Sequence, residues 1–232
     1  MQDPILVTGC ARSGTSMTAG VIDLCGAWGG KLTGALPHNR RGQFENSVIR
    51  NHIIKPYLRS MNCDPLGQKP LPDVNNLTPF PTLRKQVVDV MKTQDYEGGS
   101  WYYKGAKMCL MWPIWAEAFP GAKWIIVRRD DEAIINSCLR TGFMRRYNTI
   151  DGWQYWIDQH KKRFQEMHEA GLVIREAWPT KMVQGDFTEM QEIIDWLGLR
   201  WNDAGVRDFI SPALWSEMKR RQKRAESDGT GS

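Results

Sequence analysis

Residues 5–22 read ILVTGCARSGTSMTAGVI, and this stretch decides the fold. The apolar run at its start predicts a buried strand, and the residues from Thr15 onward are compatible with a helix up to Leu24. The turn between them contains Gly9 and Gly14, which let the backbone approach an anion closely. Free N–H groups and the positive dipole end at a helix start favour a phosphate or sulfate there. The sequence therefore predicts a strand, a phosphate-binding loop and a helix.

The spacing from Gly9 to Gly14 is that of an NTP-binding P-loop, whose consensus is G-x-x-x-x-G-K-[ST]. In that consensus the lysine reaches the β- and γ-phosphates, but here its position holds Thr15, which argues against an ATPase or a GTPase. The cation is Arg12, three residues earlier. A tight strand-to-helix turn without any ligand remains the alternative interpretation of the loop taken alone.

Length and composition predict a globular chain with a local anion site. The chain has 232 residues with 41% hydrophobic content, and we expect residues 1–218 to form a single domain with a substantial core. The segment 219–232, which we expect to be a flexible tail, carries +3 of the net charge of +5. Because the remaining body is nearly balanced, we expect no nucleic-acid partner. The oligomeric state stays open.

Cysteine usage indicates a reducing compartment. Five cysteines are odd in number, widely spaced and without any C-x-x-C pair. The His and Cys spacings offer no metal cluster, so we expect no metal. No apolar run approaches the ~20 residues of a membrane span, and the chain start lacks the pattern of a signal peptide. We therefore expect a cytoplasmic protein without membrane association.

Strands and helices alternate along the chain. Besides the opening elements, we expect strands at 101–104, 123–127 and 181–184, and helices over 47–60, 82–94, 110–119, 130–141, 153–167 and 188–197. Asn46 is the expected N-cap of the first of these helices. The segment 61–81 contains five prolines and is expected to be a loop or a lid. The fold class is therefore α/β, a P-loop-like central parallel sheet flanked by helices on both faces.

A second anion site is predicted after the strand at 123–127. The run WIIVRR ends in Arg129, and Ser137 follows eight residues later. An arginine at the carboxyl end of a strand and a hydroxyl two helical turns along the next helix can converge on one phosphate. The alternative is an arginine paired with Asp130 or Asp131 and a solvent-exposed serine.

Both anion sites resemble those of the sulfotransferases that use 3′-phosphoadenosine 5′-phosphosulfate (PAPS). The loop RSGTS is similar to the family's 5′-phosphosulfate loop, and the Arg129 and Ser137 pair resembles its 3′-phosphate site. FPGAK at 119–123 and VQGDF at 183–187 are also similar to family motifs, so that the resemblance covers residues 4–25 and 101–202. The family's terminal Arg-Lys-Gly loop has no clear match; the basic residues at 219–224 are either its substitute or a solvated tail.

The resemblance implies in-line transfer of a sulfuryl group from PAPS to a hydroxyl or amine acceptor, a small molecule or a glycan, with 3′-phosphoadenosine 5′-phosphate as product. The loop residues then hold the donor, and Arg12 lies beside the bridging oxygen, where it stabilises the charge of the leaving group. The donor-binding loop residues are Arg12, Ser13, Gly14, Thr15 and Ser16.

The family places a lysine where Lys104 stands, but the catalytic histidine of cytosolic members is replaced by Ala106. Glu45 resembles a glutamate that other branches use as the base. Its alternative role is a structural ion pair with Arg40 or Arg41. His38 is the reserve candidate for the base.

Other side chains and other functions have simpler interpretations. His160 lies on an apolar helix face and is expected to be a core residue, as are most of the tryptophans. The alternative functions are a P-loop nucleotide kinase or NTPase, with Asp130 or Asp131 holding magnesium, and a non-catalytic nucleotide-binding module.

Overall fold

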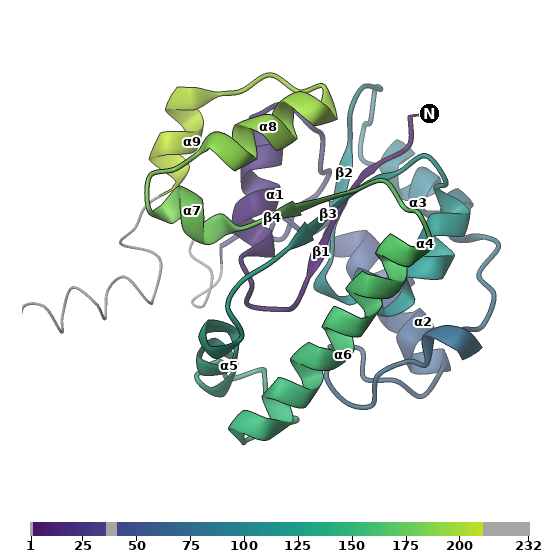
Figure 1. The fold of residues 1–232 in the computed structure, drawn as a ribbon. Helices are drawn as coiled ribbons and strands as arrows, with labels where there is room; N and C mark the ends of the chain where they lie inside the picture. The colour runs from purple at the N-terminus through teal and green to yellow at the C-terminus, as the bar shows by residue number, and fades with distance from the viewer. Residues whose placement is uncertain (1, 36–40, 211–232) are drawn as a thin grey trace, which may run out of the picture.

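The computed structural model describes residues 2–35 and 41–210. Within these residues a parallel four-stranded sheet lies at the centre in the order β2-β1-β3-β4, and helices cover both of its faces (Figure 1). The strands are β1 (Ile5–Gly9), β2 (Tyr102–Lys104), β3 (Lys123–Val127) and β4 (Ile174–Ala177).

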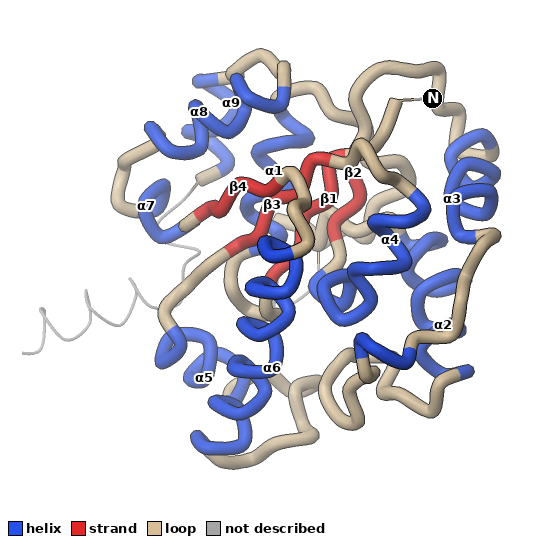
Figure 2. The backbone as a smooth tube through the Cα atoms, turned by 45° about the vertical axis from the view of Figure 1, so that its right-hand side comes forward, coloured by secondary structure: helices blue, strands red, loops and turns tan. Residues whose placement is uncertain are grey.

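The helices succeed the strands in the alternating pattern of an α/β protein (Figure 2). They are α1 (Thr15–Leu24), α2 (Lys55–Ser60), α3 (Leu83–Lys92), α4 (Trp112–Ala118), α5 (Asp131–Leu139), α6 (Ile150–Glu169), α7 (Pro179–Val183), α8 (Thr188–Leu197) and α9 (Asp203–Phe209). No helix in the described ranges is both long enough and apolar enough to cross a membrane.

Two hydrophobic cores lie on opposite faces of the sheet. Leu6, Trp124 and Ile126 point into the core formed with α2, α3, α4, α5 and α6. Ile5 and Ile125, their neighbours along the strands, point into the core formed with α1, α7, α8 and α9. Burying a large aliphatic side chain contributes about 1.5–3 kcal/mol, so apolar residues are favoured at successive positions of a sheet that is covered twice. The predicted fold class is confirmed.

The helix predicted over 47–60 is present but irregular. A π-helical stretch, Ile49–Ile54, leads directly into α2. Asn46 caps its start as predicted, because the Oδ1 atom accepts hydrogen bonds from the backbone N–H groups of Val48 at 3.2 Å and Ile49 at 3.3 Å. The helix predicted over 110–119 is divided into a 3₁₀ segment, Ala106–Met111, and α4.

The prediction of a strand at 181–184 is wrong. These residues belong mostly to α7, whose first turn contains Pro179, a residue that suits this position because it needs no hydrogen bond there. The fourth strand is β4, immediately before this helix. Arg175 and Glu176 interrupt its apolar character, and the pattern is tolerated because, in the described sheet, β4 is an edge strand.

Candidate active site

The predicted phosphate-binding loop leaves β1 at its carboxyl end and enters α1. Gly9 has a φ of 153°, and a Cβ atom there would lie 2.5 Å from the carbonyl oxygen of Val127 on β3. Gly14, the N-cap of α1, has a φ of 104°. Both positions therefore favour glycine. In the described chain the N–H groups of Thr15 and Ser16 have no carbonyl partner, so the helix start can donate hydrogen bonds to an anion.

The second predicted site lies beside this loop, because β1 and β3 are adjacent and parallel. Gly9 pairs in register with Val127, so that both carboxyl ends lie at the same edge of the sheet. The chain passes from β1 to β2 on one side and then back to β3 on the other. Open α/β sheets bind ligands at such a reversal of strand order.

Hydrogen bonds join the two predicted anion sites. The Nε atom of Arg12 donates to the Oγ atom of Ser137 at 3.0 Å, and Nη1 of Arg129 donates to the carbonyl oxygen of Arg12 at 2.9 Å. Ser137 is only 5% exposed, so the alternative of a solvent-exposed serine is wrong. The side chain of Arg12 thus lies against the second site. Asp131, one of the two alternative partners of Arg129, forms an ion pair with Lys161, with 2.6 Å between Oδ2 and Nζ.

Cations gather at this edge of the sheet. Burial lowers the pKa of Arg12, and the positive charges of Arg129 and Arg140 lower it further. Arginine nevertheless keeps its charge at any accessible pH, so the three guanidinium groups repel one another. A bound polyanion would relieve that repulsion. The Oγ atom of Ser13 is buried and has no hydrogen-bond partner within the described chain.

Glu45 and Lys104 come together from distant parts of the chain. Lys104 ends β2 next to β1, with Val7 as its register partner, and Glu45 follows Phe44, whose φ of 52° is unusual for a residue with a side chain. Burial lowers the pKa of Lys104 to about 8, although the charge of Glu45 opposes the shift. At neutral pH most Lys104 side chains therefore still carry their positive charge.

Glu45 lies in a buried cluster with two cations that the sequence analysis did not identify. Its Oε1 atom lies 3.6 Å from Nζ of Lys107, and its Oε2 atom lies 3.8 Å from Nη1 of Arg50. Burial would raise the pKa of this carboxyl group, but Lys107, Lys104 and Arg50 together lower it. Glu45 is therefore ionised at neutral pH. Oε1 is buried and accepts no hydrogen bond from the described residues.

Of the two alternative ion-pair partners of Glu45, only Arg41 lies among the described residues, and the ion pair with it is not formed. Arg41 lies 3.9 Å from the carboxylate of Asp208 instead. Arg40 and the reserve base His38 lie outside the described residues, as does the tail 219–232. Lys107 is far from Glu45 in the sequence, and the five-residue separation of Arg50 from Glu45 is not one of the i,i+3 or i,i+4 spacings that bring side chains together on a helix. No sequence signal therefore identified these partners.

Two further buried side chains have shifted pKa values: Tyr103 lies near Glu45, and His160 lies in the core on α6. Burial and the charge of Glu45 raise the pKa of the Tyr103 hydroxyl well above its usual value, so this phenol stays protonated next to the carboxylate. His160 is 1% exposed, its Nδ1 atom lies 2.8 Å from the carbonyl oxygen of Trp156, and burial lowers its pKa to about 3. The prediction that His160 is a core residue is confirmed.

The kinase alternative is not favoured. Asp131, one of the two expected magnesium ligands, also accepts a hydrogen bond from Nε2 of Gln154 at 2.9 Å. Together with Lys161, this interaction directs its carboxylate toward α6. The loop also lacks the phosphate-binding lysine of NTPases, since Thr15 occupies that position.

Comparison with known proteins supports one fold family. No protein-family profile matches the sequence, and no curated protein is similar to it in sequence. Among solved structures, the sulfotransferase STF9 from Mycobacterium avium is similar to this chain, with a TM-score of 0.60 at 16% identity over 90% of this chain and 67% of that one. The sulfotransferase domain of the Synechococcus PCC 7002 olefin synthase is also similar, with a TM-score of 0.56 at 15% identity over 94% and 89% of the two chains. The chain therefore has the P-loop-like α/β fold found in sulfotransferases.

Proposed function

We propose that the chain is a PAPS-dependent sulfotransferase. The observation that carries the proposal is the junction of two anion sites at Arg12, which lies between the phosphate loop and the Arg129 and Ser137 pair. A donor with phosphates at both its 3′ and 5′ positions needs two such sites on one edge of a sheet. The fold of the two bacterial neighbours supports the same conclusion.

In the proposed donor complex, the loop N–H groups bind the 5′-phosphosulfate, and Arg129 with Ser137 binds the 3′-phosphate. PAPS supplies the activated sulfuryl group. Arg12 stabilises the negative charge that develops on the bridging oxygen, for which its side chain has to turn away from Ser137. It acts electrostatically because a guanidinium group does not give up its proton. Lys104 adds a second positive charge near the reacting centre.

Glu45 is the proposed general base. Its carboxylate is ionised, buried and has one oxygen without a hydrogen bond, so that oxygen can accept the proton of an acceptor hydroxyl or amine. A bond forms between sulfur and the acceptor atom while the bond between sulfur and the bridging oxygen breaks. The bridging oxygen keeps the electron pair, 3′-phosphoadenosine 5′-phosphate leaves, and the acceptor proton passes to Glu45.

The proposal includes a cytoplasmic location. All five cysteines are free thiols, and Cys10, Cys25, Cys109 and Cys138 are buried, which suits a reducing compartment. Burial raises the pKa of Cys109 and of Cys138 to about 12, so neither is a reactive thiolate at neutral pH.

The test is donor binding followed by transfer. Purified protein is titrated with 3′-phosphoadenosine 5′-phosphate in the presence of EDTA, and the melting temperature is recorded. We expect a rise that grows with the logarithm of the ligand concentration above the Kd and that is absent with adenosine. Labelled PAPS is then incubated with sugars, phenols, alcohols and peptides, and the labelled products are separated. The absence of any melting shift at millimolar nucleotide would contradict the proposal.

A further inference from the structure

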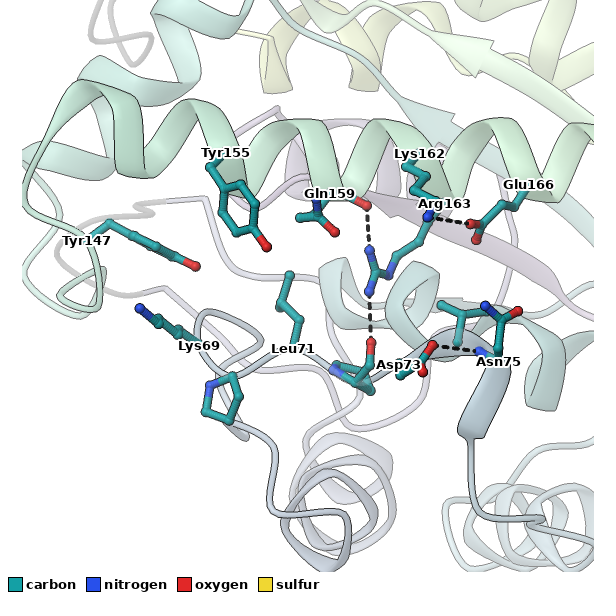
Figure 3. Close-up of a pocket in the computed structure, with 13 residues that line it drawn as sticks. Lys69, Leu71, Asp73, Asn75, Tyr147, Tyr155, Gln159, Lys162, Arg163 and Glu166 are labelled. Carbon is teal, nitrogen blue, oxygen red and sulfur yellow. Dashed lines mark hydrogen bonds and ion pairs between the residues drawn. The ribbon is translucent and has the colours of Figure 1, made fainter.

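A cleft lies on the side of α6 that faces the loop 69–75, and it shares no residue with the donor site or with the Glu45 cluster (Figure 3). Its volume is about 390 Å³, within the range of roughly 300–1,000 Å³ that is typical of small-molecule sites. The loop belongs to the proline-rich segment 61–81, which the sequence predicts to be a loop or a lid. Long loops of this kind are uncommon unless they have a function.

A buried arginine holds the two walls of this cleft together. Arg163 on α6 is 6% exposed. Its Nη2 atom donates to the carbonyl oxygen of Pro72 in the loop at 2.8 Å, and its Nη1 atom donates to the carbonyl oxygen of Gln159 at 2.6 Å. The loop and the helix are thus joined through one guanidinium group. The cleft is preformed, which reduces the conformational entropy that the protein loses when a ligand binds.

The lining combines aromatic rings with polar groups of both kinds. Tyr147 and Tyr155 lie at one end (Figure 3), and the side chain of Tyr155 is largely exposed, with 56% of the residue accessible. Carboxylates, amides and amines line the remainder, among them Asp73, Gln159 and Lys162. The three cations of the lining are nearly balanced by two carboxylates, so the cleft is no dedicated anion site. Tyrosine faces suit the apolar face of a sugar ring, and the polar groups suit its hydroxyls.

Two buried polar atoms of the cleft wall bear on which ligand the cleft can hold. The Nε atom of Arg163 and the Oε2 atom of Glu166 have no hydrogen-bond partner among the described residues. The Nε atom of Arg163 is a donor inside the wall, whereas the carboxylate of Glu166 can accept a hydrogen bond from a hydroxyl group in the cleft. An inorganic anion would be repelled by this glutamate. The side chain of Glu166 is 27% exposed and so has room to turn toward a ligand.

The segment that leads into the cleft contacts the proposed base indirectly, through Lys107. The backbone of Gly67 packs against Lys107, where a Cβ atom would lie 2.8 Å from Cγ. Lys107 in turn holds Glu45 through the ion pair described above. The carbonyl oxygen of Gly67 also accepts a hydrogen bond at 2.9 Å from Nε1 of Trp156 on α6. One short segment of chain therefore contacts Lys107, the ion-pair partner of Glu45, at one end and lines the cleft at the other.

We propose that this cleft binds an uncharged sugar unit of a glycan acceptor. The inference rests on the proposed sulfotransferase function, and it names the acceptor class that the function leaves open. The sugar that docks in the cleft is a different unit from the one that presents its hydroxyl to Glu45. The acceptor is therefore an oligosaccharide or a glycoside rather than a single small phenol.

The test measures sugar binding directly and without turnover. Saturation-transfer NMR is recorded with maltotriose, cellotriose and chitotriose as probes, on the unmodified protein and on Tyr155→Ala and Gln159→Ala. Gln165→Ala is the matched control, because this glutamine lies on the same helix but is exposed and bonded to Glu169. We expect saturable binding of at least one probe. Tyr155→Ala, which removes an aromatic ring from the cleft, should weaken sugar binding about tenfold. The control Gln165→Ala should bind the sugar as the unmodified protein does.

The melting shift with 3′-phosphoadenosine 5′-phosphate is measured on every variant to verify the fold and the donor site. If the nucleotide shift is present but no sugar binds, the cleft proposal is overturned and the sulfotransferase proposal stands. If sugar binds through Tyr155 but no nucleotide shift occurs, the cleft is a sugar site and the sulfotransferase proposal fails. Binding of phosphate in place of sugar, weakened by Lys162→Ala, would overturn the sugar assignment, as would equal sugar affinity in Tyr155→Ala and the control.

Discussion

Replacing Glu45 by glutamine tests the buried charge cluster most directly. The substitution keeps the shape of the side chain and removes its charge, while Lys107 at 3.6 Å and Arg50 at 3.8 Å remain. At these distances each attraction is roughly 4–5 kcal/mol for an effective dielectric constant of about 20. Removing one partner of a buried ion pair costs about 3–5 kcal/mol. We expect a loss near the lower end, about 3 kcal/mol, because the amide oxygen of glutamine keeps a partial negative charge toward Lys107 and Arg50.

The pH dependence of this loss has a definite sign. The pKa of Glu45 is lowered in the folded protein, so its contribution is present at neutral pH and is lost as the pH falls through the folded value. Above about pH 8 the neighbouring Lys104 is neutral in the unmodified protein. The negative charge of Glu45 then has one cation fewer to attract, so its removal costs less free energy of unfolding. The difference between variant and unmodified protein is therefore greatest near pH 6–7 and shrinks toward pH 9.

Urea unfolding at pH 5, 7 and 9 measures this difference, with Glu117→Gln as the control because Glu117 is exposed on α4. A loss of about 3 kcal/mol corresponds to roughly 6–12 °C in melting temperature for a chain of this size. In the transfer assay the variant should lose about 10²–10⁴-fold in rate while it still binds the nucleotide product. Equal stability of variant and control at pH 7, or a difference that grows toward pH 9, would refute the reasoning.

Three further substitutions test the donor site and the core. Arg129→Ala should abolish most of the melting shift with the nucleotide product, whereas Arg128→Ala, whose side chain is directed at Glu176, should keep it; equal shifts would contradict the assigned 3′-phosphate site. Gly9→Ala should lower the free energy of unfolding by more than about 1 kcal/mol, because the new methyl group meets β3 and the backbone is strained; unchanged urea unfolding would refute the close approach. His160→Leu should flatten the fall in stability between pH 6.5 and about 3, where the buried neutral ring costs up to about 1.4 kcal/mol per pH unit; an unaltered acid-unfolding profile would show that another group is responsible.

The sequence was most informative where one local motif determines the structure. The opening strand, loop and helix were predictable because strand, glycines and helix follow one another within 20 residues or so, and the apolar run of β3 indicated a strand buried on both faces. Asn46 was identified as a cap because its interactions reach only three residues ahead. The strand β4 was missed because polar residues occupy an edge position, where only one neighbour has to be satisfied.

The long-range contacts of the site were not predictable in the same way. Nothing local indicates that Glu45 meets Lys107 and Arg50, because that cluster forms only when the segment after α1 folds over the end of β2. The orientation of Arg12 toward Ser137 likewise depends on the pairing of β1 with β3, across 125 positions. Spacing within one segment predicts its elements, whereas these contacts depend on how separate elements pack.

The contact between Gly67 and Lys107 couples the proline-rich segment 61–81 to the electrostatics of the proposed base. The backbone has no free space at this point, so an inward movement of the segment displaces the stem of Lys107, whose Nζ atom lies 3.6 Å from Oε1 of Glu45. A carboxylate that loses its nearest positive neighbour becomes more basic. Arrival of an acceptor could in this way strengthen the group that has to take its proton, without any contact between the docked portion and that carboxylate.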